Sequence, residues 1–242
     1  MARPPRYTST AMITYRADHN EVDPPYLYPG YKSTSLRAPS RPLIAVEHSL
    51  SEITGPTFGE ESIAPGDDDL SRGPNGEAQG QRIIVAGRVL DGHGNPLPGM
   101  LIELWQANAA GRYDHPQDQH DAPLDRNFRG AGRCLTDADG WYRFTSVRPG
   151  AYPWGNHANA WRPAHIHFSL FGPALATRLI TQMYFEGDPL LRYDPILESI
   201  PDPAARQRLV AAFDLGLTRE GWALGYRFDI VLRGEQATPF EE

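Results

Sequence analysis

Short runs of β-branched and aromatic residues, separated by clusters of glycine and proline, constrain the fold of this chain more than any other feature. Runs of this length and composition predict β-strands, and the Gly/Pro clusters between them predict turns. We therefore expect a mainly β protein, with an antiparallel β-sandwich as its core, long ordered loops and one or two short helices. The runs cover residues 82–91, 100–107, 132–147, 162–172, 179–185 and 225–234.

Two of the turn clusters lie where hairpins are expected. The sequence GHGNPLPG at residues 92–99 separates the first two runs, and DADG at residues 137–140 interrupts the third. Apolar runs joined through such turn residues predict strands that pair with each other. The stretch DPAARQRLVAAFD at residues 202–214 predicts a helix instead, with Asp202 as N-cap, Pro203 in the first turn and an apolar face formed by Leu209, Val210 and Phe213.

Residues 1–80 differ from the remainder of the chain because they show little periodicity and are rich in proline and polar turn residues. They do not predict a stable helix. Tyr26, Tyr28 and Tyr31 nevertheless form too apolar a set for an idle tail. We expect 1–80 to be an extended N-terminal arm that packs on the core or on another subunit, and 81–242 to be the β-sandwich domain of one structural unit. A loose linker is the alternative.

Charge and composition exclude several classes of protein. The 242-residue chain has a formal net charge of −7, which argues against nucleic acid or an anionic membrane as the main partner. No apolar run approaches the roughly 18 residues that span a bilayer, and the first residues lack the apolar core of a signal peptide. With Cys134 as the single cysteine, no intrachain disulfide can form. We expect a cytoplasmic location and a buried, unreactive Cys134 on a strand.

A His-x-His pair is the first candidate for a functional site. Residues i and i+2 of a strand point to the same side, so His165 and His167 share one face while Ala164, Ile166 and Phe168 share the other. Two imidazoles at this spacing can bind one metal ion. The pair alone is a weak signal, because ordinary half-buried histidines show the same spacing.

The residues that complete such a site stay open at this point. A carboxylate would give the two-histidine, one-carboxylate set of Fe(II) enzymes. Tyr113 and Tyr152 are the other option, since phenolate is a hard anionic oxygen ligand that favours Fe(III). Two phenolates, two neutral imidazoles and one hydroxide would bring a trivalent iron to zero net charge, which a partly buried pocket tolerates.

Eight segments of the chain carry a recognisable combined pattern. They are LWQANAAGRYDHP (104–116), RCLTDADGWYRF (133–144), RPGAYPWGN (148–156), WRPAHIHFSLFGP (161–173), LITQMYFEGDPL (179–190), YRFDIVLRG (226–234), YPGYKSTSLRAP (28–39) and SEITGPTFG (51–59). Together they resemble the intradiol ring-cleaving dioxygenases, and within that family the β subunits that cleave protocatechuate. The resemblance covers nearly the whole chain, and the combined motifs are highly specific, unlike His-x-His alone.

The resemblance implies one non-haem Fe(III) per chain, with four matching positions as its ligands. These are Tyr113, Tyr152, His165 and His167, and none of the four departs from the family's pattern. By the same resemblance Tyr152 and His165 are the axial ligands, and Tyr113 and His167 are equatorial together with a solvent-derived hydroxide.

The implied reaction is the O2-dependent cleavage of protocatechuate (3,4-dihydroxybenzoate) between its hydroxyl carbons. The product is 3-carboxy-cis,cis-muconate, in aromatic catabolism through the β-ketoadipate pathway. Tyr152 is expected to accept a substrate proton once it leaves the iron, Arg162 to support charge that develops on the ring, and Gln182 to lie near the ring. The expected substrate-binding residues are Tyr31, Trp154, Arg162, Gln182 and Ile196.

The resemblance also implies a partner, because such β subunits pair with a homologous α subunit that lacks the ligand set. The pocket then lies at the interface between the two subunits. Three alternatives remain: a dioxygenase for plain catechol or hydroxyquinol, a non-enzymatic β-sandwich binding subunit, and an Fe(II) enzyme that cleaves beside the diol. The first has a helical N-terminal segment, which the proline-rich arm does not resemble.

The other noticeable residues are expected to have structural roles only. Trp161 is expected to contribute packing, and the acidic run 67–69 to form a solvated turn. His115, His120 and His157 are expected to lie in loops.

Overall fold

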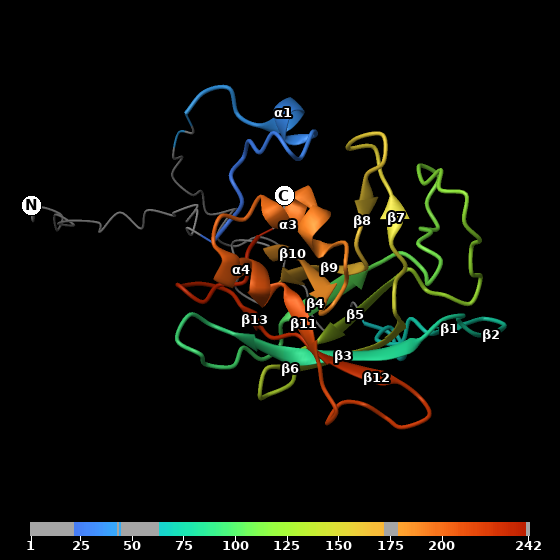
Figure 1. Cartoon of the computed structure of the whole chain (residues 1–242). Helices are drawn as coiled ribbons and strands as arrows, with labels where there is room; N and C mark the ends of the chain where they lie inside the picture. Colours follow the sequence, from blue (N-terminus) through green and yellow to red (C-terminus); the bar gives the residue numbers. More distant parts are fainter. Residues whose placement is uncertain (1–21, 43, 45–62, 172–178, 241–242) are drawn as a thin grey trace, which may run out of the picture.

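The computed structural model describes residues 22–42, 44, 63–171 and 179–240. Most of these residues belong to the β-rich part of the chain (Figure 1). The segment SEITGPTFG at 51–59 and the first 21 residues of the expected arm lie outside the described residues. No helix among the described residues has the length and apolar character needed to cross a membrane.

One large mixed sheet organises the described chain. Its strands follow the order β13-β3-β12-β11-β10-β9-β4-β5, and β6 pairs with β3 outside this path. The mainly β class is confirmed, but the pairing is not wholly antiparallel, because β10–β11, β12–β3 and β13–β3 are parallel. The strands are β3 (Arg82–Leu90), β4 (Leu101–Trp105), β5 (Ala131–Leu135), β6 (Trp141–Val147), β9 (His165–Phe171), β10 (Leu179–Phe185), β11 (Val210–Phe213), β12 (Leu224–Arg227) and β13 (Ile230–Val231).

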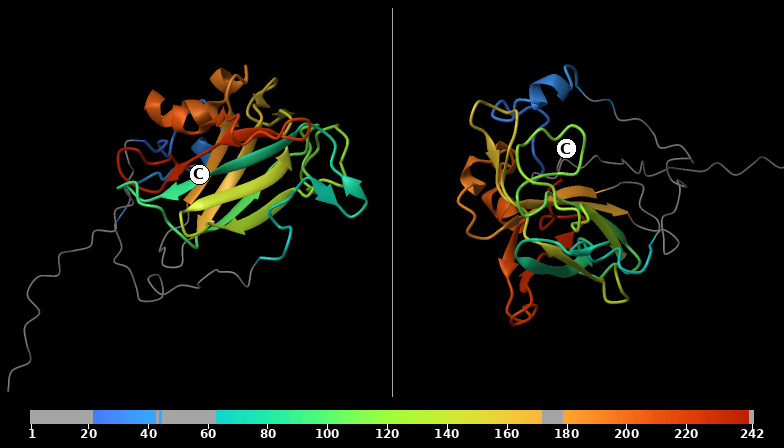
Figure 2. Two further views of the ribbon diagram at one scale, coloured as in Figure 1. Left: turned by 90° about the horizontal axis from the view of Figure 1, so that it is seen from below. Right: turned by 90° about the vertical axis from the view of Figure 1, so that its right-hand side faces the viewer.

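The sheet folds over so that two layers enclose the main core. The layer with β3, β6 and β12 faces the layer with β4, β9 and β10 (Figure 2). Phe168 of β9 is fully buried, and its ring centroid lies 5.9 Å from that of Tyr142 and 6.5 Å from that of Phe144, both on β6. These aromatic contacts join the two layers, and burial of the apolar faces is the main force that holds them together.

Both expected hairpins are wrong, although their turns are where the sequence predicts them. β3 pairs with β6, whereas β4 pairs with β5 and β9, so residues 91–100 cross from one layer to the other. Residues 136–140 likewise carry the chain from β5 in one layer to β6 in the other. Turn residues allow the chain to reverse, but the burial of each strand's apolar face decides which strands become neighbours.

Within the described residues, four short helical segments accompany the sheet: α1 (Thr34–Arg37), the 3₁₀ turn η2 (Leu191–Tyr193), α3 (Pro195–Glu198) and α4 (Pro203–Arg208). Asp202 caps α4 as predicted, since its carboxylate accepts hydrogen bonds from the backbone N–H groups of Ala204 and Ala205. The expected extension of this helix to residue 214 is wrong. Val210–Phe213 instead form β11, because these residues gain ladder hydrogen bonds between β10 and β12.

Parts of the N-terminal arm pack on the domain. Val22 joins a second buried cluster with Leu197, and Leu70 is fully buried in the main core. The Asp23 carboxylate accepts a hydrogen bond from the backbone N–H of Phe240 near the other end of the chain. The arm also contains the helical turn α1 and the two-residue strands β1 (Arg72–Gly73) and β2 (Gly76–Glu77). The division of the chain at residues 80/81 stays a prediction.

Candidate active site

The outer face of the β9 layer carries the candidate site. His165 and His167 alternate with Ile166 and Phe168 along β9, and the apolar pair is fully buried in the core. The register of β9 with β10 sets His167 opposite Gln182 and His165 opposite Tyr184. Directly paired residues project to the same face of a sheet, so both histidines share the outer face with Gln182 and Tyr184. Trp105 of β4 stacks flat on His167, with 4.8 Å between ring centroids.

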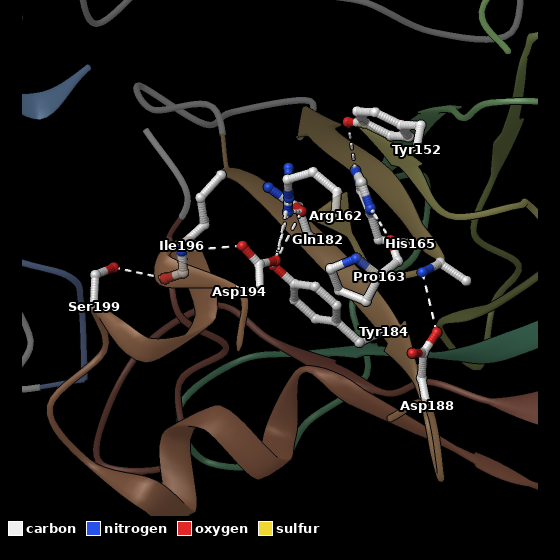
Figure 3. Close-up of polar contacts among 11 residues, drawn as sticks. Tyr152, Arg162, Pro163, His165, Gln182, Tyr184, Asp188, Asp194, Ile196 and Ser199 are labelled. Carbon is white, nitrogen blue, oxygen red and sulfur yellow. Dashed lines mark hydrogen bonds and ion pairs between the residues drawn. The ribbon is translucent and has the colours of Figure 1, made fainter. Parts of the chain in front are cut away.

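Tyr152 meets His165 at this face (Figure 3). Tyr152 begins the two-residue strand β7 (Tyr152–Pro153), which pairs with β8 (Trp161–Arg162). Its Oη lies 3.2 Å from His165 Nε2, while His165 Nδ1 lies 2.7 Å from the carbonyl oxygen of Pro163. A carbonyl can only accept, so Nδ1 carries the ring proton and the Nε2 lone pair faces Tyr152.

The 3.2 Å separation bears on the expected axial pair of Tyr152 and His165. With metal–ligand distances near 2.0–2.1 Å, opposite ligand atoms would lie about 4 Å apart and neighbouring ones about 3 Å apart. The observed separation places both atoms within reach of one ion. The assignment of this pair to axial positions stays a prediction.

Tyr113 reaches the site from the loop after β4. Gly111 in this loop has φ +78°, and a Cβ at this position would lie 2.2 Å from the carbonyl oxygen of Ala151. Only glycine combines this left-handed backbone with such a close approach. The approach brings Tyr113 beside Tyr152 in an edge-on arrangement, with 5.4 Å between ring centroids. The backbone N–H of Tyr113 donates to the Asp118 carboxylate at 2.7 Å, which fixes the chain at this point.

The four predicted ligand residues thus form a continuous series of ring contacts. Tyr152 lies 5.4 Å from His165, and His165 lies 4.9 Å from His167, measured between ring centroids. In the parts of the chain that the structure covers, no three His, Cys, Asp or Glu side chains are grouped to hold a metal. A two-histidine, one-carboxylate site therefore lacks a carboxylate there, whereas two phenols and two imidazoles converge. This donor set fits a ferric ion.

The surroundings of His165 keep its imidazole neutral, which is the form that binds a metal ion. Burial is the largest cause, followed by the positive charge of Arg162, and together they hold the pKa of His165 well below its ordinary value. The imidazole is therefore neutral at pH 7, and a metal ion need not displace a proton from Nε2.

Arg162 lies across the β7–β8 ladder from Tyr152 and is buried, with 3 % of its surface exposed. Its Nη2 donates to Gln182 Oε1 at 2.5 Å and to the Asp194 carboxylate at 2.9 Å. Tyr184 Oη lies within hydrogen-bond distance of both acceptors, at 3.1 and 3.0 Å, and its one proton can be donated to either. Figure 3 shows this group next to His165. The structure therefore brings Arg162 and Gln182 together.

The three remaining substrate-binding candidates lie around this group. Tyr31 and Ile196 line one pocket together with Gln182. Trp154 lies beside them, because its ring is 5.5 Å from the Tyr31 ring and 5.6 Å from Arg162 Cζ. Trp154 Nε1 and Gln182 Nε2 are buried and have no hydrogen-bond partner among the described residues. Two buried donors without partners are consistent with a site that receives a polar ligand.

Most of the residues that were expected to have only structural roles lie in the kind of element that the sequence predicts. His115, His120 and His157 lie in loops, and residues 67–69 form a turn. Cys134 lies on β5 and packs against the main core. Trp161 differs, because 40 % of its surface is exposed and its ring meets His120 edge-on rather than packing inside.

Sequence reasoning missed three residues of the site. Tyr184 follows Gln182 by two positions on one strand, so the alternation of side chains along a strand could have placed Tyr184 on the same face as Gln182. Trp105 lies near the end of a predicted strand, but nothing marked it as a neighbour of His167. Asp194 precedes Pro195 and so indicates a helix start, whereas its ion pair with Arg162 depends on the fold.

Comparison with known proteins gives the site its context. A family model described as "Dioxygenase" matches residues 53–234, and one described as "Protocatechuate 3,4-dioxygenase beta subunit N terminal" matches residues 15–49. A protocatechuate 3,4-dioxygenase beta chain of Burkholderia cepacia is 59% identical, covering 90% of this chain and 93% of the relative. An alpha chain of Pseudomonas putida is 32% identical, covering 68% of this chain and 77% of the relative.

A solved structure shares the fold as well. The dioxygenase domain of a dioxygenase–carbohydrate-binding fusion protein from Streptomyces sp. SirexAA-E matches with a TM-score of 0.51 and 28% identity, covering 74% of this chain and 94% of that domain. The chain belongs to the intradiol ring-cleaving dioxygenase family, whose members are non-haem iron oxidoreductases. Among its relatives, the protocatechuate 3,4-dioxygenase beta chain matches it over nearly its whole length.

Proposed function

We propose that this chain is the iron-bearing β subunit of an enzyme that cleaves protocatechuate with O2 to 3-carboxy-cis,cis-muconate, in aromatic catabolism through the β-ketoadipate pathway. The observation that carries the proposal is the convergence of two phenols and two imidazoles on one face, with Tyr152 Oη 3.2 Å from His165 Nε2. The 59% identity to a protocatechuate 3,4-dioxygenase beta chain supports the substrate. The single cysteine fits a reducing compartment, and we propose the cytoplasm.

The residues that would hold one Fe(III) are Tyr113, Tyr152, His165 and His167. Ferric iron bound there would act as a Lewis acid that draws electron density from a chelated catechol and opens its ring to O2. The protein supplies two anionic oxygen donors and two neutral nitrogen donors at a partly buried site. This combination favours the ferric state over the ferrous one.

Tyr152 is the proposed proton acceptor. A catechol must lose two protons to bind a metal through both oxygens. The Tyr152 phenolate would be a strong enough base to take one at Oη, and the expected hydroxide would take the other. Tyr152 begins the β7–β8 hairpin, at the end of a loop that contains Gly150. Its ring contacts Tyr113 and His165, which orient it toward the site.

Arg162 and Gln182 are proposed to act on the substrate ring. Arg162 provides a preorganised positive charge where negative charge develops as one ring oxygen becomes ketonic. Gln182 orients the guanidinium through Oε1 and leaves its buried Nε2 as a donor. Tyr31, Trp154 and Ile196 then form the surrounding walls of the substrate pocket.

The proposed partner is a homologous α subunit. A protocatechuate 3,4-dioxygenase alpha chain matches this chain at 32% identity, so the two kinds of subunit are related. The proposal predicts that this chain forms an αβ hetero-oligomer and that the α subunit contributes to the pocket. Expression of this chain alone, followed by measurement of its mass and activity, tests the partner. A fully active monomer would count against it.

The visible absorption spectrum tests the function itself. The purified, iron-loaded protein is expected to show a broad phenolate-to-Fe(III) band, and anaerobic protocatechuate should shift that band. Catechol and hydroxyquinol serve as comparison substrates, and faster cleavage of either would reassign the specificity. A colourless protein with stoichiometric metal would mean that the tyrosines are not ligands, and the proposed reaction would then be wrong.

A further inference from the structure

Asp194 is the buried ion-pair partner of Arg162, although neither the sequence motifs nor the ligand set points to it. Asp194 has no exposed surface, and Arg162 has 3 %. We propose that Asp194 is a positioning residue for ring cleavage: one carboxylate oxygen holds the Arg162 guanidinium at the site, and the other holds the start of α3 with Ile196. This inference rests on the proposed function, because it assigns a role to Asp194 within that reaction.

The first part of the argument is the contact geometry. Asp194 Oδ2 accepts hydrogen bonds from Arg162 Nε at 3.2 Å and from Arg162 Nη2 at 2.9 Å. Tyr184 Oη donates to the same oxygen at 3.0 Å. Asp194 Oδ1 accepts from the backbone N–H of Ile196 at 3.1 Å and so caps α3. Figure 3 shows the carboxylate between Ile196 on one side and the guanidinium on the other.

The second part concerns what a long cationic side chain needs in order to serve as a fixed charge. Arginine has many rotamers, so a useful position must be imposed by contacts on several sides. Asp194 holds the Nε edge, Gln182 Oε1 accepts from Nη2, and the Trp154 ring lies 5.6 Å from Cζ. A buried guanidinium also requires an opposite charge, and the Asp194 carboxylate contacts it at 2.9 Å.

In the proposed reaction, Asp194 acts only through other residues of the chain. It makes no hydrogen bond to the four ring ligands among the described residues, so any effect on the reaction must pass through Arg162, Tyr184 or α3. A role confined to α3 would be merely structural. The role through Arg162 can be separated from the role as a helix cap, because the chain contains a second aspartate that has only the capping role.

Asp202 is that matched control. Asp202 precedes Pro203 at the start of α4, as Asp194 precedes Pro195 at the start of α3. Its carboxylate accepts from the N–H groups of Ala204 and Ala205 at 2.9 and 3.1 Å, and it does not contact Arg162. Asp194→Asn and Asp202→Asn therefore make the same change at the same kind of helix cap, which asparagine can also form, but only the first removes the negative charge that contacts the Arg162 guanidinium.

The experiment uses the iron-loaded chain assembled with its α subunit. For each variant it measures kcat and KM for protocatechuate, the substrate dissociation constant from the anaerobic spectral shift, and the thermal midpoint. We expect Asp194→Asn to lower kcat about 10- to 100-fold, with the dissociation constant changed less than about threefold. Asp202→Asn is expected to keep kcat within about twofold and to change the thermal midpoint little, because asparagine caps a helix about as well as aspartate.

Tyr184→Phe keeps the proposal testable if Asp194→Asn does not fold. This change removes hydrogen bonds to Arg162 and Asp194 and retains both charges. We expect kcat to fall about 3- to 10-fold at an unchanged dissociation constant. A normal kcat in either folded variant, with only a lower thermal midpoint, would overturn the positioning role. An inactive wild-type assembly would overturn the proposed function and this inference together, so the two failures are distinct.

Discussion

His167 on β9 and Gln182 on β10 are direct cross-strand partners. Because paired residues project to one face, this register sets the Gln182 amide beside a proposed iron ligand. A slip of one residue would turn His165 and His167 into the core and Ile166 and Phe168 outward. The burial of the apolar pair therefore fixes the same register that assembles the site. Four predictions test the residues of the site and of the core around it.

Replacing Tyr152 by phenylalanine tests the phenolate. The ring contacts with Tyr113 and His165 remain, but Oη is lost. We expect an altered visible spectrum and a fall in kcat/KM of about 10²- to 10⁴-fold, since the change removes a proton acceptor. Absorption spectroscopy and steady-state kinetics measure the two effects. Tyr193→Phe is the control, because Tyr193 is 61 % exposed. Unchanged colour and rate in Tyr152→Phe would contradict the ligand assignment.

Gly111→Ala tests the close approach that brings Tyr113 to the site. An added Cβ would lie 2.2 Å from the Ala151 carbonyl oxygen, and φ is +78°. We expect a loss of about 2–5 kcal/mol in unfolding free energy, together with lower iron content. Denaturant titration and metal analysis give both values. Gly94→Ala shares the strained φ of +82° but has nothing within 4 Å, so it should cost about 1–2 kcal/mol and leave iron content normal. Equal effects at both glycines would be inconsistent with this account.

Phe168→Ala tests the core beneath the histidines. Phe168 is fully buried against aromatic rings of the facing layer, so truncation should cost about 3–5 kcal/mol of unfolding free energy. Phe213→Ala should cost less than about 1 kcal/mol, because Phe213 is 46 % exposed. Chemical denaturation compares the two. A small loss at Phe168 would mean that the layers do not depend on this contact.

Cys134 provides a test of pH dependence. Burial is the largest cause that raises its pKa from 9.0 to about 12. The unfolded thiol therefore ionises first, so this contribution to stability is complete below pH 9 and is lost as the pH rises toward 12. Between these values the stability of the wild type, relative to Cys134→Ala, should fall by up to about 1.4 kcal/mol per pH unit.

Two measurements check this behaviour of Cys134. Denaturation of wild type and Cys134→Ala between pH 8 and 10.5 gives the stability difference. Alkylation by iodoacetamide at pH 8 should be far slower in the native protein than in the unfolded one, because the thiolate is the reactive form. Rapid alkylation of the native thiol would show that it ionises near its ordinary pKa.

Local patterns in the sequence were sufficient for several parts of the structure. The Asp202-Pro203 cap, the turn at residues 137–140 and the alternation of His165 and His167 with apolar residues all depend on neighbours in the chain. Each involves backbone geometry over a few residues, which the side chains in that stretch control. The resemblance of whole segments added the tyrosines, which spacing alone left as one option among two.

Pairing between distant strands was not predictable in the same way. β3 and β4 were expected to form a hairpin but lie in different layers, and Val210–Phe213 were expected to be helical but form a strand. Turn residues are compatible with either outcome. The choice depends on which apolar faces bury each other and on ladder hydrogen bonds between strands far apart in sequence.

The sequence by itself determined the class of fold, the family and the residues that form the candidate iron site, because these depend on residue identity and local spacing. Only the tertiary structure decided that Tyr152 Oη lies 3.2 Å from His165 Nε2, and that Asp194 holds Arg162. The physical reason is the same in both cases. Distances between side chains from different strands and loops follow from how the layers pack, and packing is a property of the whole chain.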